Sequence, residues 1–132
     1  MGIVPDQFND IMESTALAYL ATTGPDGAPQ VSPVWFTWDG AVLRFSTLRA
    51  RQKCRNMERE PRMAVAITDP ANPYRSLELR GTVELVDDPD KLFPHVVNRK
   101  YLGQAADPAH LPPADQRVIG VFTPEKVLVF GA

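Results

Sequence analysis

The 132-residue chain contains one cysteine and two histidines, and this scarcity excludes several kinds of chemistry. A single thiol, Cys54, cannot build an internal disulfide framework, which fits a reducing compartment such as the cytoplasm. His95 and His110 have no neighbouring cysteine or histidine that would complete a metal site. We therefore expect no metal centre, and we read His95 as an ordinary helix residue. Cys54 is interpreted as a core residue, with a nucleophilic role as the weaker alternative.

Long apolar runs and a strong net charge are lacking as well. No apolar segment approaches the roughly 20 residues needed to span a bilayer, and residues 1–10 have no basic region followed by an apolar core. A formal net charge of −2 argues against a general nucleic-acid binder. The phosphate-binding and metalloprotease motifs Walker A, G-x-G-x-x-G and H-E-x-x-H do not occur. We expect one cytoplasmic domain over residues 1–132, with neither membrane nor nucleic acid as partner.

Turn signals and apolar patterns predict seven strands and three helices. Gly-Pro-Asp-Gly at 24–27 and Asp-Gly at 39–40 are typical hairpin turns. Strict alternation over 76–86 predicts a half-solvated strand. The expected strands are 16–23, 28–38, 41–47, 63–68, 76–86, 117–122 and 126–130. The expected helices are 5–14, about three turns within 49–62, and 87–103 with an irregularity at Pro94, and the expected loops include 69–75 and 104–116.

This order of elements indicates an α+β fold. Most of the expected strands are joined by hairpins and few by long crossovers, so the sheet should be mainly antiparallel. Seven strands in a chain of this length bury their apolar faces most easily by closing into a small barrel. The sequence therefore predicts a β-barrel with peripheral helices.

Positive charge is concentrated in one segment, "RARQKCRNMEREPR" at residues 49–62. It holds six of the fourteen Lys and Arg residues and two of the sixteen acids, so its formal charge is +4 while the rest of the chain carries −6. Ala50, Cys54 and Met57 form an apolar stripe at helical spacing, which predicts an amphipathic helix. Ser46 or Thr47 can cap its start, and Pro61 ends it.

The start of this helix is the best candidate for an anion site. Arg51 and Lys53 fall in the first turn, where a helix already presents free N–H groups and a partial positive charge. A guanidinium and an ammonium added there would provide a fork and a point charge for a phosphate. The alternative is an ordinary solvated helix face.

The segment "DPANPYR" at 69–75 is a second feature of interest. Prolines on both sides of Asn72 stiffen it, and rigid loops at the rim of a barrel often hold ligand contacts. Tyr74 could stack on a ring, and Arg75 adds a cation. The alternative is a turn that is merely stabilised by proline.

The pattern also resembles a known family. "LATTGPDGAPQVSPVWFTWDG", the K-x-R-N-x-x-x-x-P-R run beginning at Lys53, the N-P-Y-R segment at 72–75 and "RVIGVFTPEKV" resemble the pyridoxamine-5′-phosphate-oxidase-like split β-barrels. Within them the chain is most similar to the actinobacterial branch of F420-dependent flavin/deazaflavin oxidoreductases, over residues 8–130. The resemblance implies a mainly antiparallel split barrel of six to seven strands, a homodimer, and a cofactor at the dimer interface. The chain ends before the extension that holds pyridoxal phosphate in the vitamin B6 oxidases, which argues against that activity.

The resemblance also implies roles for individual residues. Arg51 and Lys53 would hold the cofactor phosphate, and Ser46 and Thr47 would assist at the ribityl chain and phosphate. The remaining implied cofactor contacts are Gln30, Val31, Ser32, Pro33 and Val34 along the ring, and Asn72, Pro73, Tyr74 and Arg75 at the border of the site. No residue is identified as catalytic; Tyr74 and Arg44 are candidates for the proton donor.

These observations lead to one hypothesis and three rivals. The hypothesis is an oxidoreductase in which reduced coenzyme F420 delivers hydride to an electron-poor small organic substrate. The rivals are the same fold with FMN as cofactor, a non-catalytic protein that binds F420 or a flavin, and a nucleic-acid binder that uses the basic helix. Binding by the last would fall steeply with salt.

Overall fold

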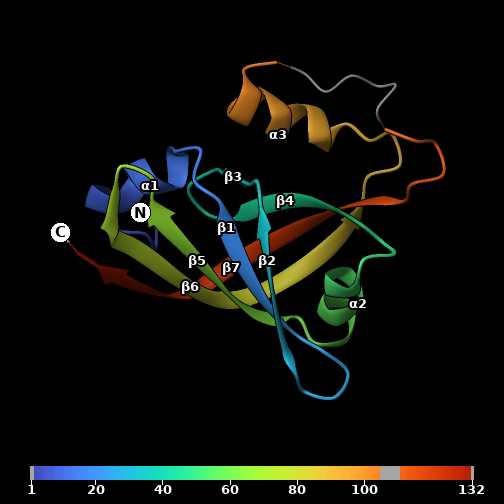
Figure 1. Cartoon of the computed structure of the whole chain (residues 1–132), viewed down its shortest axis with the longest axis horizontal. Helices are drawn as coiled ribbons and strands as arrows, with labels where there is room; N and C mark the ends of the chain where they lie inside the picture. The colour runs from blue at the N-terminus through green and yellow to red at the C-terminus, as the bar shows by residue number, and fades with distance from the viewer. Residues whose placement is uncertain (1, 105–110, 132) are drawn as a thin grey trace.

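The computed structural model describes residues 2–104 and 111–131 of the chain. Figure 1 shows a strongly curled sheet with α1 at one end and with α2 and α3 at the other. The helical elements are the 3-10 helix η1 (Asp6–Phe8), α1 (Asn9–Glu13), α2 (Gln52–Arg59) and α3 (Phe93–Leu102). The strands are β1 (Ala18–Thr23), β2 (Pro29–Val34), β3 (Thr37–Trp38), β4 (Leu43–Leu48), β5 (Arg62–Asp69), β6 (Asn72–Asp87) and β7 (Arg117–Phe130).

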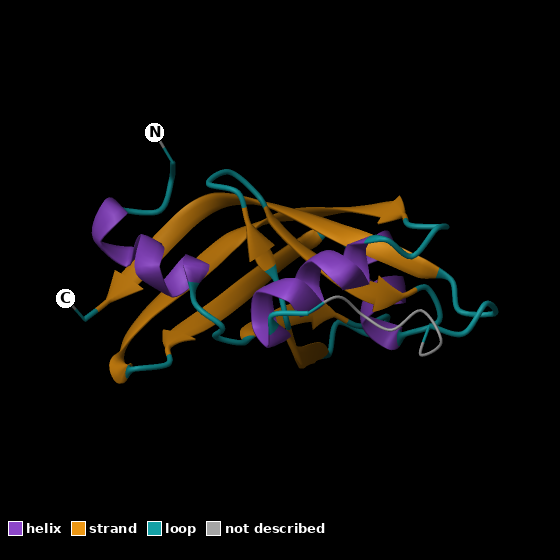
Figure 2. Cartoon of the chain, turned by 90° about the horizontal axis from the view of Figure 1, so that it is seen from above, coloured by secondary structure: helices purple, strands orange, loops and turns teal. Residues whose placement is uncertain are grey.

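All seven strands belong to one antiparallel sheet with the order β2-β1-β5-β6-β7-β4-β3. The long strands β6 and β7 pair over most of their length and form its middle. Within the described residues no ladder joins the outer strands β2 and β3, so the barrel remains open along one side. Figure 2 shows the curl of the sheet from above. The expectation of an antiparallel split barrel with peripheral helices is confirmed.

The core fills the concave side of the sheet because alternate residues of each strand point inward. In β4, Leu43, Phe45 and Thr47 are buried, whereas the residues between them are partly exposed. Gly120 lies opposite Phe45, and a Cβ there would come within 2.2 Å of the Phe45 ring. The absence of a side chain on β7 therefore lets this ring fill the middle of the barrel.

Two strand predictions were wrong. Residues 28–38 form two strands, β2 and β3, because the chain bends at Trp35 and Phe36; the Phe36 amide leaves the ladder and donates to the Tyr101 hydroxyl at 3.2 Å. Residues 117–122 and 126–130 are one strand rather than two. Pro124, which lacks an N–H, lies where the register between β6 and β7 shifts beside Gly81.

The other differences concern the ends of elements. Residues 69–75 are not a long loop: Pro70 and Ala71 form a tight turn, and β6 starts at Asn72. The first helix is divided into η1 and α1. The helix predicted for 87–103 begins at Phe93, because the Asp88 carboxylate accepts the amides of residues 92 and 93, at 3.1 and 3.0 Å. Pro94 therefore lies in the first turn, which tolerates proline. Part of the predicted 104–116 loop lies outside the described residues.

Candidate functional site

The basic segment forms α2, which a buried amide attaches to the sheet. Asn56 is fully buried, and its Nδ2 donates to Thr22 Oγ1 at 3.1 Å and to Gln30 Oε1 at 3.0 Å. Its Oδ1 accepts the Gln52 side chain at 2.8 Å. Because Thr22 and Gln30 belong to β1 and β2, this network fixes the orientation of α2 against the open side of the barrel.

The start of α2 differs from the prediction. Arg51 itself occupies the N-cap position, without a side-chain capping bond, and the helix begins at Gln52. Ser46 and Thr47, which were expected to cap the helix, lie within β4 instead. The buried stripe is confirmed at Cys54 and Met57, but it does not include Ala50, which is exposed and precedes the helix.

Four of the six cations in residues 49–62 are engaged by neighbours. Arg49 pairs with Glu58 at 2.7 Å, and Arg62 pairs with Glu60 at 2.6 Å. The other two donate to backbone carbonyls: Arg55 to that of Ala50 and Arg59 to that of Thr23. Among the residues that the structure describes, Arg51 and Lys53 form neither an ion pair nor a hydrogen bond through their side chains. These two cations remain for a ligand.

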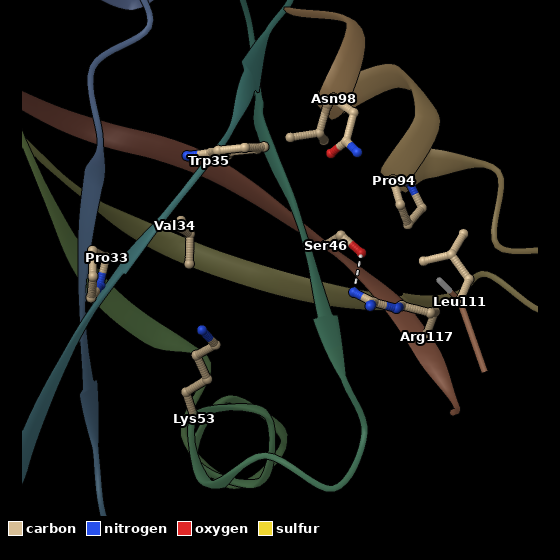
Figure 3. Close-up of a pocket in the computed structure, with 10 residues that line it drawn as sticks. Pro33, Val34, Trp35, Ser46, Lys53, Pro94, Asn98, Leu111 and Arg117 are labelled. Atoms are coloured by element: carbon tan, nitrogen blue, oxygen red, sulfur yellow. Dashed lines mark hydrogen bonds between the residues drawn. The ribbon is translucent and has the colours of Figure 1, made fainter. Parts of the chain in front are cut away.

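A cavity of about 430 Å³ lies beside Lys53. Its walls come from the end of β2, from β4, from the start of α2, from α3 and from the first residue of β7, as Figure 3 shows. This volume is within the roughly 300–1,000 Å³ of small-molecule sites. Among the residues that the structure describes, two cations and no carboxylate line the cavity, so it should favour an anionic ligand. The lining residues are Pro33, Val34, Trp35, Ser46, Lys53, Pro94, Val97, Asn98, Leu111 and Arg117.

Burial changes the titration of two side chains on α2. It lowers the pKa of the Lys53 ammonium, and the nearby charge of Arg51 lowers it further, because neither influence favours a cation. An anion in the cavity would reverse this effect. Burial raises the pKa of the Cys54 thiol, with the Glu58 charge acting in the same direction. The thiol therefore remains protonated at neutral pH, which agrees with a core role.

An aromatic wall closes the cavity on the side of α3. The Trp35 ring stacks on Tyr101, with centroids 4.8 Å apart and an interplanar angle of 4°. The Tyr101 hydroxyl donates to the Ala16 carbonyl at 2.7 Å. Lys100 Nζ donates to the Phe36 carbonyl at 2.9 Å and lies 4.0 Å from the centre of the Phe36 ring. These contacts attach α3 to the bend between β2 and β3 and hold the Trp35 ring in place.

The five predicted contacts on β2 are divided between two faces. Gln30, Ser32 and Val34 alternate with the more exposed Val31 and Pro33. Pro33 and Val34 line the cavity, whereas Gln30 bonds to Asn56. The Ser32 hydroxyl is buried and has no hydrogen-bond partner among the described residues. Val31 faces a different hollow, on the outer side of β1 and β5.

The predicted pair on β4 is divided in the same way. Ser46 lines the cavity, whereas Thr47 is buried on the core side of the strand. Thr47 follows Ser46 directly, and because successive side chains of a strand point to opposite faces, its side chain points into the core and away from the cavity. Arg44 lies two residues before Ser46 but pairs with Asp39 at 2.7 Å, outside this lining.

The predicted contacts at 72–75 lie at the opposite end of the sheet. Figure 1 places the β5–β6 turn beside α1, far along β6 from α2 and α3. Tyr74 is 87% exposed there. Arg75 donates to Asp10 at 2.7 Å and to Asp69 at 2.9 Å, and it lies 4.8 Å from the Phe8 ring centre. Within one chain these residues do not join the cavity that contains Lys53.

Sequence reasoning missed the residues that reach the cavity from the distant parts of the chain. Trp35 was read as part of a continuous strand, and Arg117 as the first residue of an apolar one. In the sequence alone, an aromatic residue within an apolar run and a cation at the start of a strand are weak signals. Their position depends on how β7 and α3 pack, which the local pattern does not contain.

Over residues 2–104 and 111–131 the structure shows no group of three or more His, Cys, Asp and Glu residues arranged to hold a metal ion. In the same ranges, no helix is both long and apolar enough to cross a bilayer.

Known proteins share this fold and much of this sequence. A solved F420 reductase is 44% identical to the chain, over 95% of this chain and 98% of that protein, with a TM-score of 0.85. The conserved hypothetical protein Rv2991 from Mycobacterium tuberculosis is 25% identical over 97% and 86%, with a TM-score of 0.78. General Stress Protein 26 from Bacillus anthracis str. Sterne, 18% identical over 95% and 92% with a TM-score of 0.70, shows the likeness of fold alone.

Among curated proteins, none matches the chain. The family model described as pyridoxamine 5′-phosphate oxidase matches residues 4–130, which is nearly the whole sequence. The match includes every strand and helix that forms the cavity beside Lys53. The chain therefore belongs to the pyridoxamine 5′-phosphate oxidase family of split β-barrels.

Proposed function

We propose that the protein is a reductase that binds coenzyme F420 in the cavity beside Lys53 and uses its reduced form to deliver hydride to an electron-poor small organic substrate. Membership of the family supports a flavin or deazaflavin oxidoreductase, and the similarity to an F420 reductase at 44% identity supports the deazaflavin. The observation that carries the proposal is a cavity whose lining, over residues 2–104 and 111–131, contains cations and an aromatic ring but no carboxylate.

The side chains around the cavity fit such a cofactor. Lys53 would hold the phosphate together with Arg51, which is exposed at the start of the same helix, and the Ser46 hydroxyl borders the same cavity. Pro33, Val34 and the Trp35 ring offer apolar surface to a planar ring system. The deazaflavin supplies the hydride when bound. The protein binds and orients the cofactor and provides a shielded space for the substrate. Proximity and orientation would then provide much of the acceleration.

We also propose a homodimer, because the outer faces of β1, β2 and β7 leave apolar side chains uncovered. Tyr19, Val31 and Phe130 are 42, 64 and 51% exposed, and all three line one shallow hollow. A second chain over this surface could bring its residues 72–75 towards the cofactor, as the resemblance implies. Light scattering during gel filtration would test this: a monomer would leave residues 72–75 without a route to the cavity.

The test of function is a parallel titration of the purified protein with F420 and with FMN, following the fluorescence of each. Tighter binding of F420 supports the proposal, and turnover is then measured with reduced F420 and a series of electron-poor alkenes. FMN could bind the same site, because both cofactors offer a phosphate to the same cations. Tighter binding of FMN would assign the protein to the flavin branch of the family. Tight binding of F420 without turnover of any acceptor would favour a carrier. Failure to bind either cofactor would contradict the proposal.

A further inference from the structure

Arg117 is a cation in this cavity to which neither the sequence nor the family pattern assigned a role. It is the first residue of β7 and pairs with Leu48 of β4. Ser46 lies two residues along β4 on the same face, and Arg117 Nη1 donates to Ser46 Oγ at 3.5 Å. Figure 3 shows the guanidinium extending into the cavity from the side of Leu111, opposite Lys53.

Arg117 differs from the other arginines in similar surroundings. Arg44, Arg49 and Arg75 are partly buried as well, and each holds a carboxylate oxygen at 2.7 Å. Arg117 forms no ion pair with any residue in 2–104 or 111–131. Asp87 and Asp115 line a neighbouring hollow that Arg117 also borders, but neither comes within ion-pair distance. This arginine is therefore held in place without a counter-charge from the described chain.

The hydrogen bonds of Arg117 are incomplete too. Its Nε is shielded from solvent and has no partner among the described residues, and its one side-chain bond, to Ser46, is long. A shielded cation without a partner costs stability, whereas one that meets an oxyanion gains a strong charge-assisted bond. The guanidinium fork matches a carboxylate or phosphate in two-point contact, which an ammonium cannot reproduce.

We propose that Arg117 binds an oxyanion of the ligand, a carboxylate or a phosphate, at a second point of the cavity separate from Lys53. Ser46 positions the guanidinium, and Asn98 on α3 borders the same space. This inference rests on the proposed function, because it concerns the same cavity. The oxyanion has two sources: the phosphate and acidic tail of the cofactor, or an acidic group on the substrate.

The experiment compares Arg117→Gln and Arg117→Lys with the parent and with Arg44→Gln. Arg44 is a matched control, because it is a partly buried arginine on the same face of β4 as Ser46 but outside the cavity. Binding is measured for two pairs that differ by their acidic groups: FMN with riboflavin, and F420 with the deazaflavin that lacks its phosphate and tail. Inorganic phosphate is titrated in parallel, by thermal shift, against the cofactor-free and the cofactor-loaded protein.

If the cofactor phosphate supplies the oxyanion, Arg117→Gln weakens both FMN and F420 by roughly tenfold or more; if the acidic tail supplies it, only F420 is weakened. In both cases the uncharged analogues bind as before. If the substrate supplies it, cofactor affinity is kept while the loaded protein loses roughly tenfold in affinity for phosphate. Arg117→Lys should recover part of either loss, because it keeps the charge without the fork. The melting temperature of Arg117→Gln should equal or exceed that of the parent.

Three results would overturn the inference. Arg117→Gln could match Arg44→Gln for every ligand; it could weaken charged and uncharged analogues equally; or it could lower the melting temperature markedly, as expected of a structural arginine. The parent protein distinguishes this failure from failure of the proposed function. A parent that binds neither F420 nor FMN contradicts the function, whereas the phosphate titration of the cofactor-free protein still decides the role of Arg117.

Discussion

The two ends of the barrel hold their cations in opposite ways. Beside α1, Arg75 is surrounded by Asp10, Asp69 and the Phe8 ring, so its charge is balanced within the chain. Beside α2 and α3, Lys53 and Arg117 share a cavity in whose lining the described part of the chain places no acid. The first arrangement closes an end of the sheet, and the second leaves positive charge for a molecule that is not part of the chain. Basic residues are present at both ends, and the acidic partners around them determine whether their charge is balanced within the chain or free for a ligand.

The largest effect is expected from detaching α2 from the sheet, at the end of the barrel that holds the cavity. Asn56→Leu removes the bonds to Thr22, Gln30 and Gln52 and leaves buried polar groups unpaired, which should cost about 2–4 kcal/mol of unfolding free energy. Chemical denaturation followed by circular dichroism measures this loss. Gln52→Ala is the control, because it removes one of these bonds and should cost less than about 1 kcal/mol. Equal losses in the two variants would contradict the anchoring role of Asn56.

Removing the Lys53 charge from the cavity should affect ligand binding but not folding. Lys53→Ala loses a charge-assisted phosphate contact worth about 1.5–3 kcal/mol, which weakens cofactor binding roughly 10- to 150-fold. Fluorescence titration gives the dissociation constants. Arg55→Ala removes the same charge from the same helix, but Arg55 donates to Ala50 and Gln52 instead of lining the cavity. If Lys53→Ala and Arg51→Ala both bind the cofactor as well as the parent does, the phosphate assignment is wrong.

At the end beside α1, removing a cation should reduce stability and leave ligand binding unchanged. Arg75→Gln leaves Asp10 and Asp69 without their cation, so the melting temperature should fall, by less than in Asn56→Leu. The pKa of Asp10, which the Arg75 hydrogen bond lowers, should return towards its ordinary value. Arg80→Gln, which breaks an exposed pair with Glu78, is the control and should change little. A loss of cofactor affinity in Arg75→Gln would indicate that the 72–75 segment of a partner chain reaches the cavity.

The smallest effect is a dependence on pH behind the aromatic wall. Burial lowers the pKa of Lys100 to about 8 from the ordinary 10.5. Between these values the unfolded chain binds more protons than the folded chain, so stability should increase as pH rises from 8 to 10. Lys100→Met lacks this group, and the difference between parent and variant isolates it from other titrations. A difference in melting temperature that is constant over this range would contradict the prediction.

The sequence was informative where the pattern is local. Alternation over residues 76–86 predicted a strand with one buried and one solvated face, and the spacing of Cys54 and Met57 predicted the buried side of α2. Distant contacts decided the rest. The bend at Phe36 depends on a hydroxyl 65 residues further along the chain, and the continuity of β7 depends on Gly81 of β6.

In the candidate site, too, local patterns indicated some residues, and distant contacts determined the others. Lys53 belongs to the basic segment and Ser46 precedes that segment by three residues, so both could be proposed from the sequence. Arg117 and Trp35 enter the cavity only because β7 and α3 pack against β4 and the bend before β3. A local pattern contains no record of that packing.

The strand order also has a consequence for the time course of folding. In the described sheet β4 lies between the two-residue β3 and β7, whereas β1, β2, β5 and β6 can pair in turn as the chain lengthens. During synthesis β4 must therefore wait for residues 117–130, and contacts between such distant segments form slowly. Ser46 and Arg117 meet only in that last step. The ligand pocket should be the final part of the molecule to form, and a ligand that binds it would preferentially stabilise the completed chain.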